Sequence, residues 1–253
     1  MKSKVWLTLL LAFMFCLPVF AKPFVPEYVQ SAQVDLNGDG IKDNVSIKDL
    51  DPESDWSGRF ELTVNNLVLE SKLDFKVDGI VIVDIDQSDV YLEVAVYTSG
   101  PSSDDEYLIY RYDGKKLLKV GLVYRWAYFP GNGIVYANDW MQFWEKRDKY
   151  VLNKQTGVLD LVPQELYYVG EKATVVKTFP LYRSRQTSDI VAWLREGSEI
   201  EILVCDVSPG SKEAEYIDDL YQDWYLIKSS SDLIGWARLD SFLNKVEGLP
   251  LAD

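Results

Sequence analysis

The sequence of 253 residues contains no histidine, only two cysteines and only three methionines. The absence of histidine excludes Ser-His-Asp and Cys-His catalytic groups and every metal site built on imidazole. Basic residues are also in deficit, with 26 Lys and Arg against 40 Asp and Glu, for a formal net charge of −14. A field of this sign disfavours nucleic acids and anionic lipids, so we expect neither as a partner.

Long apolar runs are equally scarce, and the only one lies at the N-terminus. Lys2 and Lys4 precede the apolar run 5–15, and Ala21 supplies the small residue typical of a cleavage point. This pattern predicts a secretory signal peptide over residues 1–21. No other segment approaches the roughly 20 apolar residues of a membrane-spanning helix. We therefore expect a secreted, extracytoplasmic protein, in the periplasm or at the cell surface, with no membrane span.

Loss of the signal peptide would leave one cysteine, because Cys16 lies inside it. No intramolecular disulfide could then form. The remaining Cys205 follows the strand-like run 199–204, where we expect a buried, inert thiol. Hydrophobic residues make up 47% of the chain, with 16 Tyr and 8 Trp, which excludes a disordered acidic chain.

Short segments rich in β-branched and aromatic residues dominate the chain, and Asn-Gly and Asp-Gly turn signals separate them. This spacing predicts an all-β protein of meandering hairpins. The expected strands cover residues 60–64, 81–84, 92–97, 107–112, 150–153, 174–179, 199–204, 224–227 and 234–237. Segments 139–146 and 212–221 have weak helical patterns.

Two domains are expected after the signal peptide, over residues 22–168 and 169–253. Pro163 and Gly170 bracket the junction between them. Because no low-complexity linker divides the chain there, we expect the two domains to be in contact.

The most specific local pattern is segment 35–43, Asp-Leu-Asn-Gly-Asp-Gly-Ile-Lys-Asp. Side-chain oxygens occur at loop positions 1, 3, 5 and 9, and the glycine at position 6 permits the sharp turn that calcium loops need. The pattern predicts a Ca²⁺ site with these ligands: Asp35, Asn37, Asp39, the carbonyl of Ile41, and Asp43. It is not an EF-hand, because Ser46 stands where that motif requires glutamate. The alternative is a hairpin turn without metal.

A related acidic segment begins at Asp84, 49 residues after Asp35. It lacks the glycine, and its last acid comes one residue later. Two interpretations remain open. The segment is either a degenerate repeat that forms a second metal site or a charged surface turn. Its candidate ligands are Asp84, Asp86, Asp89 and Glu93.

The Asp-Leu-Asn-Gly-Asp-Gly loop between strand-like segments resembles the FG-GAP/VCBS-type repeats that build calcium-binding β-propellers. Segments 83–86, 93–96 and 110–115 are similar to propeller-like regions of secreted Firmicutes proteins. The resemblance covers roughly residues 30–170 and implies that the loop acids bind Ca²⁺. This length is too short for a seven-bladed propeller, so we expect a propeller-like domain or a small β-meander.

The C-terminal part resembles a bacterial SH3-like domain over roughly residues 172–243. The matching segments are 181–185, 190–197, 199–203, 224–228 and 235–238, followed by Phe242. The resemblance implies a small barrel that binds cell-wall peptides or other extended ligands. The candidate contact residues are Tyr182, Trp193, Trp224 and Trp236, although a core position is the more usual role of such side chains. An acidic insertion at 212–219 departs from the family pattern.

A further aromatic group, Trp140, Phe143 and Trp144, permits two interpretations. These side chains form either a sugar-stacking platform or, as is more usual, part of a core.

Together these features predict a secreted, non-catalytic, calcium-binding protein whose SH3-like module binds a cell-wall component or an extracellular protein. The alternative is an accessory or inhibitory partner of a secreted enzyme, engaged through the acidic surface. A carboxylate-based glycan hydrolase is a third interpretation, because two acidic side chains suffice for that reaction, but no constellation of residues points to it. The ligand and the oligomeric state are left open.

Overall fold

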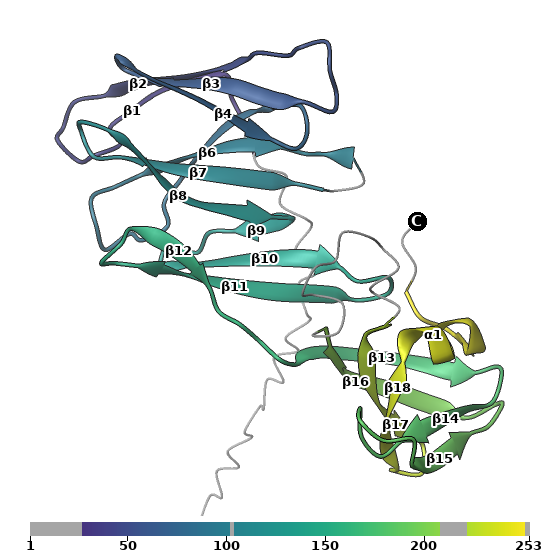
Figure 1. Cartoon of the computed structure of the whole chain (residues 1–253). Coiled ribbons are helices and arrows are strands. Elements are labelled where there is room, and N and C mark those ends of the chain that lie inside the picture. The colour runs from purple at the N-terminus through teal and green to yellow at the C-terminus, as the bar shows by residue number, and fades with distance from the viewer. Residues whose placement is uncertain (1–26, 102–103, 208–221, 251–253) are drawn as a thin grey trace, which may run out of the picture.

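The computed structural model describes residues 27–101, 104–207 and 222–250. Regular structure in these residues is almost entirely antiparallel β, which confirms the predicted all-β class (Figure 1). The predicted signal peptide, the acidic insertion 212–219 and the helical candidate 212–221 lie outside the described residues. In the described part of the chain, no helix has the length and apolar character needed to cross a membrane.

Three four-stranded sheets form the N-terminal part. The first contains β1 (Ser31–Val34), β2 (Asp43–Asp49), β3 (Gly58–Val64) and β4 (Leu67–Leu73). The second contains β5 (Gly79–Val83), β6 (Glu93–Thr98), β7 (Glu106–Tyr112) and β8 (Leu117–Tyr124). The third contains β9 (Trp126–Tyr128), β10 (Ile134–Trp140), β11 (Glu145–Asn153) and β12 (Val158–Leu161). Within each sheet, neighbours in the chain are neighbours in space.

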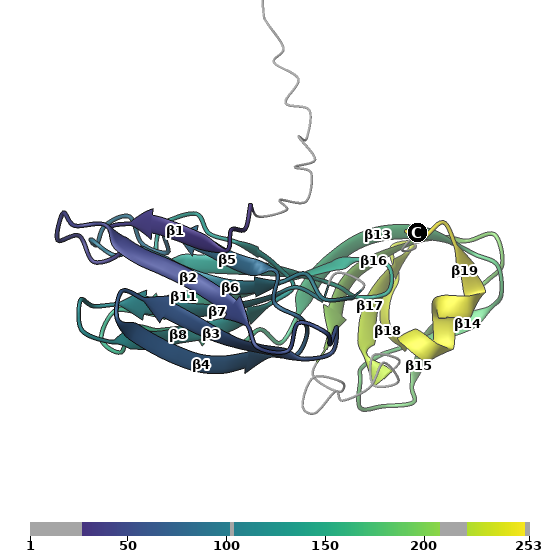
Figure 2. The same cartoon turned by 90° about the horizontal axis from the view of Figure 1, so that it is seen from above.

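These sheets stack face to face, so the second sheet is covered on both sides (Figures 1 and 2). One core cluster, around Phe60 and Val94, joins the first and second sheets. Another, around Ile109 and Val135, joins the second and third. Every residue of β6 is therefore buried, whereas β2 alternates between buried and exposed positions, as expected for a sheet with one face open.

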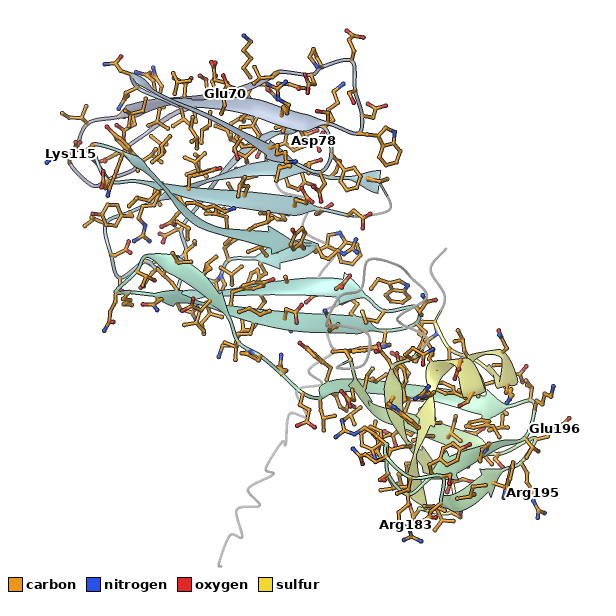
Figure 3. All side chains as sticks on the ribbon, viewed as in Figure 1. Glu70, Asp78, Lys115, Arg183, Arg195 and Glu196 are labelled. Carbon is orange, nitrogen blue, oxygen red and sulfur yellow. The ribbon has the colours of Figure 1, made fainter. Side chains whose placement is uncertain are left out.

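The first and third sheets each keep one open face. Glu70 projects from the open face of the first sheet (Figure 3). Among the described residues, no strand pairing joins the first sheet to the third. The stack is therefore open, and the first and third sheets are its two outer layers.

The C-terminal part is one seven-stranded sheet that curves around a single core cluster. Its strand order is β15-β14-β18-β17-β16-β13-β19. Its strands are β13 (Tyr167–Val175), β14 (Phe179–Tyr182), β15 (Ile190–Leu194), β16 (Glu199–Asp206), β17 (Trp224–Ser229), β18 (Ile234–Arg238) and β19 (Val246–Glu247). Two short helices, α1 (Leu239–Phe242) and η3 (Leu243–Lys245), lie between β18 and β19 in the chain. In the described part of the chain the edge strands β15 and β19 do not pair, so hydrogen bonds do not close the expected barrel.

Three local expectations need correction. Segment 139–146 is a β-hairpin rather than a helix, because Trp140 pairs with Glu145 and a tight turn joins them. The expected strand 174–179 is divided between the end of β13 and the start of β14. Gly170 lies inside β13, at a bulge where its φ of 77° suits glycine, and not at a linker.

The tip of the β10–β11 hairpin joins the stack to the C-terminal sheet. Phe143 and Trp144 are 0% and 2% exposed and belong to the core cluster of the seven-stranded sheet. The indole N–H of Trp144 donates a hydrogen bond to the hydroxyl of Tyr225 at 3.2 Å, and the Phe143 ring lies 5.6 Å from that of Tyr225. The core interpretation is correct for these two residues, whereas Trp140 is 37% exposed. The C-terminal core is incomplete without this hairpin.

Candidate functional site

The predicted calcium loop, residues 35–43, connects β1 and β2 and lies against the second sheet. The N–H of Leu92 donates to the carbonyl of Leu36 at 3.0 Å. Gly38 has a φ of 72°, and a Cβ added there would lie 2.6 Å from the Cβ of Val90. Glycine is thus required at this position both by conformation and by the close approach of the two loops. The turn between β7 and β8 lies beside this loop, and Lys115, which is labelled in Figure 3, belongs to that turn.

Within the loop, the acidic side chains organise the turn. The carboxylate of Asp35 accepts hydrogen bonds from the backbone N–H groups of Gly38, Asp39 and Gly40 at 2.8, 3.2 and 2.8 Å. Asp39 accepts from the N–H of Ile41 at 2.8 Å and from the amide of Asn37 at 3.1 Å. Asp35, Asn37 and Asp39 are therefore linked within one turn.

Asp43 ties this turn to the body of the first sheet. It is 5% exposed, and its carboxylate accepts hydrogen bonds from the N–H of Leu36 at 3.0 Å and from the amide of Asn65 at 2.7 Å. No ion pair formed by the described residues reaches Asp35, Asp39 or Asp43. The loop thus carries three carboxylates that form no ion pair among the described residues, although Lys42 belongs to the same segment.

The donor chemistry of the loop fits Ca²⁺. An ionised carboxylate offers about four lone-pair sites, so the two or three hydrogen bonds on each acid leave acceptor capacity. Carboxylate, amide and carbonyl oxygens are the ligands that Ca²⁺ takes. In the described residues, however, no three or more acidic or thiol side chains converge as a metal-binding group, so an ion would have to draw the loop oxygens closer together.

In the second acidic segment, basic side chains from other strands pair with the acids. The guanidinium of Arg111 lies 2.8 Å from Glu93, through its Nε, and 3.3 Å from Asp89. The ammonium group of Lys154 lies 2.7 Å from Asp86. Three of the four predicted ligands therefore already have a cationic partner.

These contacts also alter the pKa values of the acids. Hydrogen bonds from Lys154 and Ser88 lower the pKa of Asp86 to about 2. Burial raises the pKa of Glu93, which is 0% exposed, and the Arg111 guanidinium opposes that rise. Partial burial, followed by the nearby charge of Asp89, raises the pKa of Asp84.

The two acidic segments occupy equivalent positions in consecutive sheets. The N–H of Leu36 donates to Asp43 in the first segment, and the N–H of Ile85 donates to Glu93 at 3.1 Å in the second. The carbonyl of Leu36 accepts a hydrogen bond from the second sheet, and that of Ile85 accepts one from Gly133 beside the third, at 2.7 Å. The difference is chemical, because the buried acid meets the neutral Asn65 in the first sheet and the cationic Arg111 in the second.

The four aromatic residues predicted to contact a ligand lie together on the outer face of the seven-stranded sheet. Their strand neighbours point into the core, so the alternation of a strand directs the four outward. These neighbours are Leu181, Leu194, Tyr225 and Ala237. The expectation that a core position is more usual is wrong for all of them, since none is buried. We call this surface the aromatic face, and its rings are Tyr182, Trp193, Trp224 and Trp236.

Two arginines that the sequence analysis did not select cover part of the aromatic face. The guanidinium of Arg185 lies 5.1 Å from the centroid of the Trp236 ring, and that of Arg238 lies 5.0 Å from Trp224. Arg185 also pairs with Asp206 and Glu165. Both arginines lie in segments that resemble the SH3-like domain, 181–185 and 235–238, but their contacts with the rings depend on pairing across strands and have no local signal.

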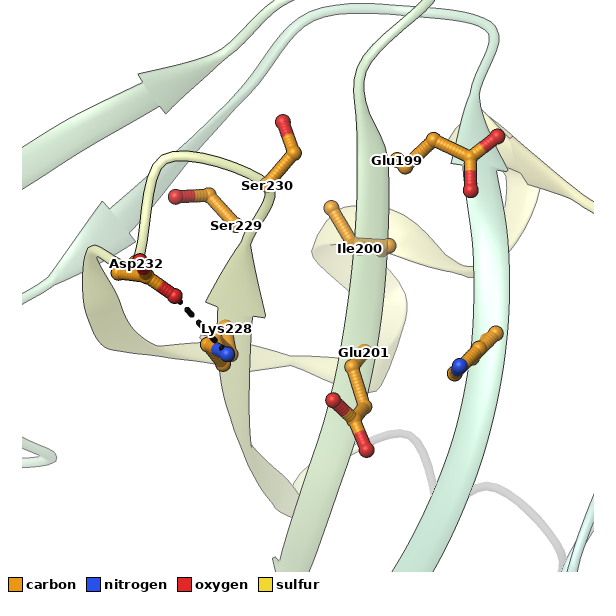
Figure 4. A pocket seen from close by; sticks show the side chains of 8 residues that line it. Glu199, Ile200, Glu201, Lys228, Ser229, Ser230 and Asp232 are labelled. Atoms are coloured by element: carbon orange, nitrogen blue, oxygen red, sulfur yellow. Dashed lines mark ion pairs between the residues drawn. The ribbon is translucent and has the colours of Figure 1, made fainter.

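Elsewhere on this sheet a shallow polar pocket of about 170 Å³ contains a row of alternating charges (Figure 4). Lys172, Glu201 and Lys228 are neighbours across three strands, and Lys228 also pairs with Asp232 at 2.9 Å. Because its two lysines are opposed by three acidic side chains and its lining contains no aromatic side chain, this pocket is a weaker candidate than the aromatic face. Cys205 is fully buried, and burial raises the pKa of its thiol, as expected for an inert cysteine.

Comparisons with protein-family models, with curated proteins and with solved structures find no match for this chain. The assignment of function therefore depends on the geometry of these surfaces.

Proposed function

We propose that this protein is an exported, non-catalytic binding protein whose aromatic face holds an extended cell-wall peptide. The observation that carries the proposal is the outward placement of Tyr182, Trp193, Trp224 and Trp236 on one sheet, where a core role was the more usual expectation. Rigid aromatic side chains provide flat apolar contact at a small cost in conformational entropy, which suits an extended ligand.

The arginines add a polar component to this face. Arg238 donates a hydrogen bond to Gln222 at 2.8 Å and has no ion pair among the described residues. A guanidinium that is held over an indole ring and not neutralised can bind a carboxylate in a bidentate manner. A wall peptide offers both extended backbone and free carboxylates, so it matches the rings and the cation together.

This proposal is tested by retention of the full chain, without residues 1–21, on purified peptidoglycan. We expect the wild type to be retained and Trp224→Ala or Trp236→Ala to lose about 2 kcal/mol of binding free energy, or roughly 30-fold in affinity, as for a central interface aromatic residue. Trp56→Ala is the matched control, because Trp56 is 75% exposed on the N-terminal stack. Wild type that stays in the unbound fraction, or face variants that bind like the control, would refute the proposal.

We further propose that loop 35–43 binds Ca²⁺ and so stiffens the connection between β1 and β2 in the first sheet. The support is that Asp35, Asp39 and Asp43 form no ion pair among the described residues, whereas the acids of the equivalent segment pair with Arg111 and Lys154. Binding to the folded state alone stabilises a protein by about 2.7 kcal/mol when the ligand is present at 100 times its Kd. Addition of millimolar Ca²⁺ should therefore raise the Tm, and chelator should reverse the change.

The two equivalent loops supply a matched pair of variants for this calcium test. Asp39→Asn should abolish most of the Ca²⁺-dependent rise in Tm, because it removes one ligand charge from the first loop. Asp89→Asn, in the second loop, should lower the Tm itself but preserve the response to Ca²⁺. A Tm that does not respond to Ca²⁺ in the wild type, together with no heat on titration, would show that the loop is a metal-free turn.

A further inference from the structure

The open face of the third sheet carries a row of aromatic side chains that none of the described elements covers. Trp126 and Tyr128 on β9 and Tyr136 and Trp140 on β10 project to the same side, and Tyr128 lies opposite Tyr136 in the strand register. Their neighbours Ala127, Val135 and Ala137 point the other way, into the core shared with the second sheet. Tyr128 is 61% and Trp140 37% exposed. The third sheet ends the stack on this side (Figure 1).

These four rings differ from the aromatic residues on the inner side of the stack. Tyr97, Tyr107 and Phe129 pack against one another at centroid distances of 5.0 and 5.9 Å. Among the described residues, none of the four outer rings packs against another aromatic ring. No aromatic ring of the described residues therefore covers their faces.

Two basic side chains lie beside the rings on the neighbouring strand β11. Lys149 is opposite Tyr136, and Arg147 is opposite Asn138. The Nε of Arg147 donates to the side-chain carbonyl of Asn138 at 2.9 Å, which orients the guanidinium. Neither Arg147 nor Lys149 forms an ion pair in the described part of the chain, although the protein has a net charge of −14. Glu145, opposite Trp140, adds one carboxylate to this face and accepts a hydrogen bond from the amide of Asn138 at 3.3 Å. The rings are thus flanked by two cations that form no ion pair and by one acid at the end of the row.

We propose that this open face binds an anionic polysaccharide, a chain of sugar rings that carries carboxylate or phosphate groups. Sugar rings present flat C–H surfaces that stack on aromatic rings, and their anionic groups complement Lys149 and Arg147. The four residue-to-residue steps from Tyr136 to Trp140 span roughly 13 Å at about 3.3 Å per step, which is the length of a short oligosaccharide. A polar residue, Asn138, stands at the centre of the row, which suits a hydroxyl-rich ligand better than the apolar centre of a protein interface.

Affinity electrophoresis of the full chain, without residues 1–21, tests this proposal with three polymers. Polygalacturonate provides carboxylates, phosphomannan provides phosphates, and dextran is neutral, and all three are built of sugar rings. We expect one or both anionic polymers to retard the protein and dextran to have no effect. The double variant Tyr128→Ala/Trp140→Ala should weaken binding by roughly tenfold or more, because truncated interface aromatic residues typically cost this much. Lys149→Gln should weaken binding and flatten its dependence on salt.

Controls separate this surface from the aromatic face and from fold effects. Trp56→Ala, which removes a more exposed indole elsewhere on the stack, should be retarded like the wild type. Trp224→Ala should also bind the anionic polymers normally, even though it loses peptidoglycan, so the two proposals fail independently. Equal retardation by dextran would overturn the proposal. So would self-association that Tyr128→Ala abolishes in a protein that binds none of the polymers, because the face would then be an interface between copies.

Discussion

Replacing Phe143 by alanine is expected to destabilise the whole protein by about 3–5 kcal/mol, the usual cost of removing a buried phenyl ring. Phe143 is 0% exposed and belongs by sequence to the third sheet, yet its ring contacts Tyr225 and Phe242 in the C-terminal core. The loss should appear in urea unfolding as a lower midpoint at unchanged slope. Because the ring joins two parts of the chain, both parts should unfold at the same lower urea concentration.

The same hairpin provides the control for this substitution. Trp140 lies three residues away and is 37% exposed on the open face, so Trp140→Ala should cost less than about 1 kcal/mol. Comparable losses for the two variants would show that the hairpin tip does not complete the C-terminal core. If the tip does complete it, a fragment that begins after residue 168 lacks Phe143 and Trp144. Ligand screens should therefore use the full chain.

Replacing Arg111 by methionine is expected to cost about 3–5 kcal/mol near neutral pH, because it leaves a buried carboxylate without its partner. Glu93 is 0% exposed, and the Arg111 side chain that pairs with it is 13% exposed. Arg59→Met is the matched control. Arg59 is 55% exposed, and its guanidinium lies 3.5 Å from the carboxylate of Asp51. Because an exposed ion pair contributes little, the loss of Arg59 should cost less than about 1 kcal/mol.

The cost of the Arg111 substitution should depend on pH. Burial raises the pKa of Glu93 in the folded protein, and removal of the guanidinium should raise that pKa further. When the pKa of a carboxyl group is higher in the folded state than in the unfolded state, the protein loses stability as the pH rises. The loss begins near the unfolded-state pKa of about 4.3 and is complete above the folded-state pKa. The deficit of Arg111→Met should therefore shrink towards pH 4 in urea unfolding. Adding Glu93→Gln should restore much of the stability at pH 7, and a deficit that is independent of pH would contradict this account.

Much of the fold could be predicted from local patterns in the chain. Alternation of apolar and polar residues placed β3, β6, β7, β16, β17 and β18 to within a few residues, because the two-residue period of a strand is a local property. The turn glycines Gly38, Gly40 and Gly114 all have positive φ, as their Asn-Gly and Asp-Gly context indicated. The buried state of Cys205 followed from the apolar strand that contains it.

The candidate sites were harder to predict, because they depend on which strands meet. Whether an aromatic side chain lies in a core or on a surface depends on which face of its strand another sheet covers. Trp144 and Trp140 belong to one hairpin, yet only Trp144 enters the C-terminal core. The partner of a buried acid likewise comes from another strand, as with Arg111 for Glu93 and Asn65 for Asp43. Sequence pattern alone thus specified the strands, the turns and the all-β class. The open faces of the stack and the compensation of its buried charges arose only from long-range packing, because both require residues far apart in the chain to be brought into register.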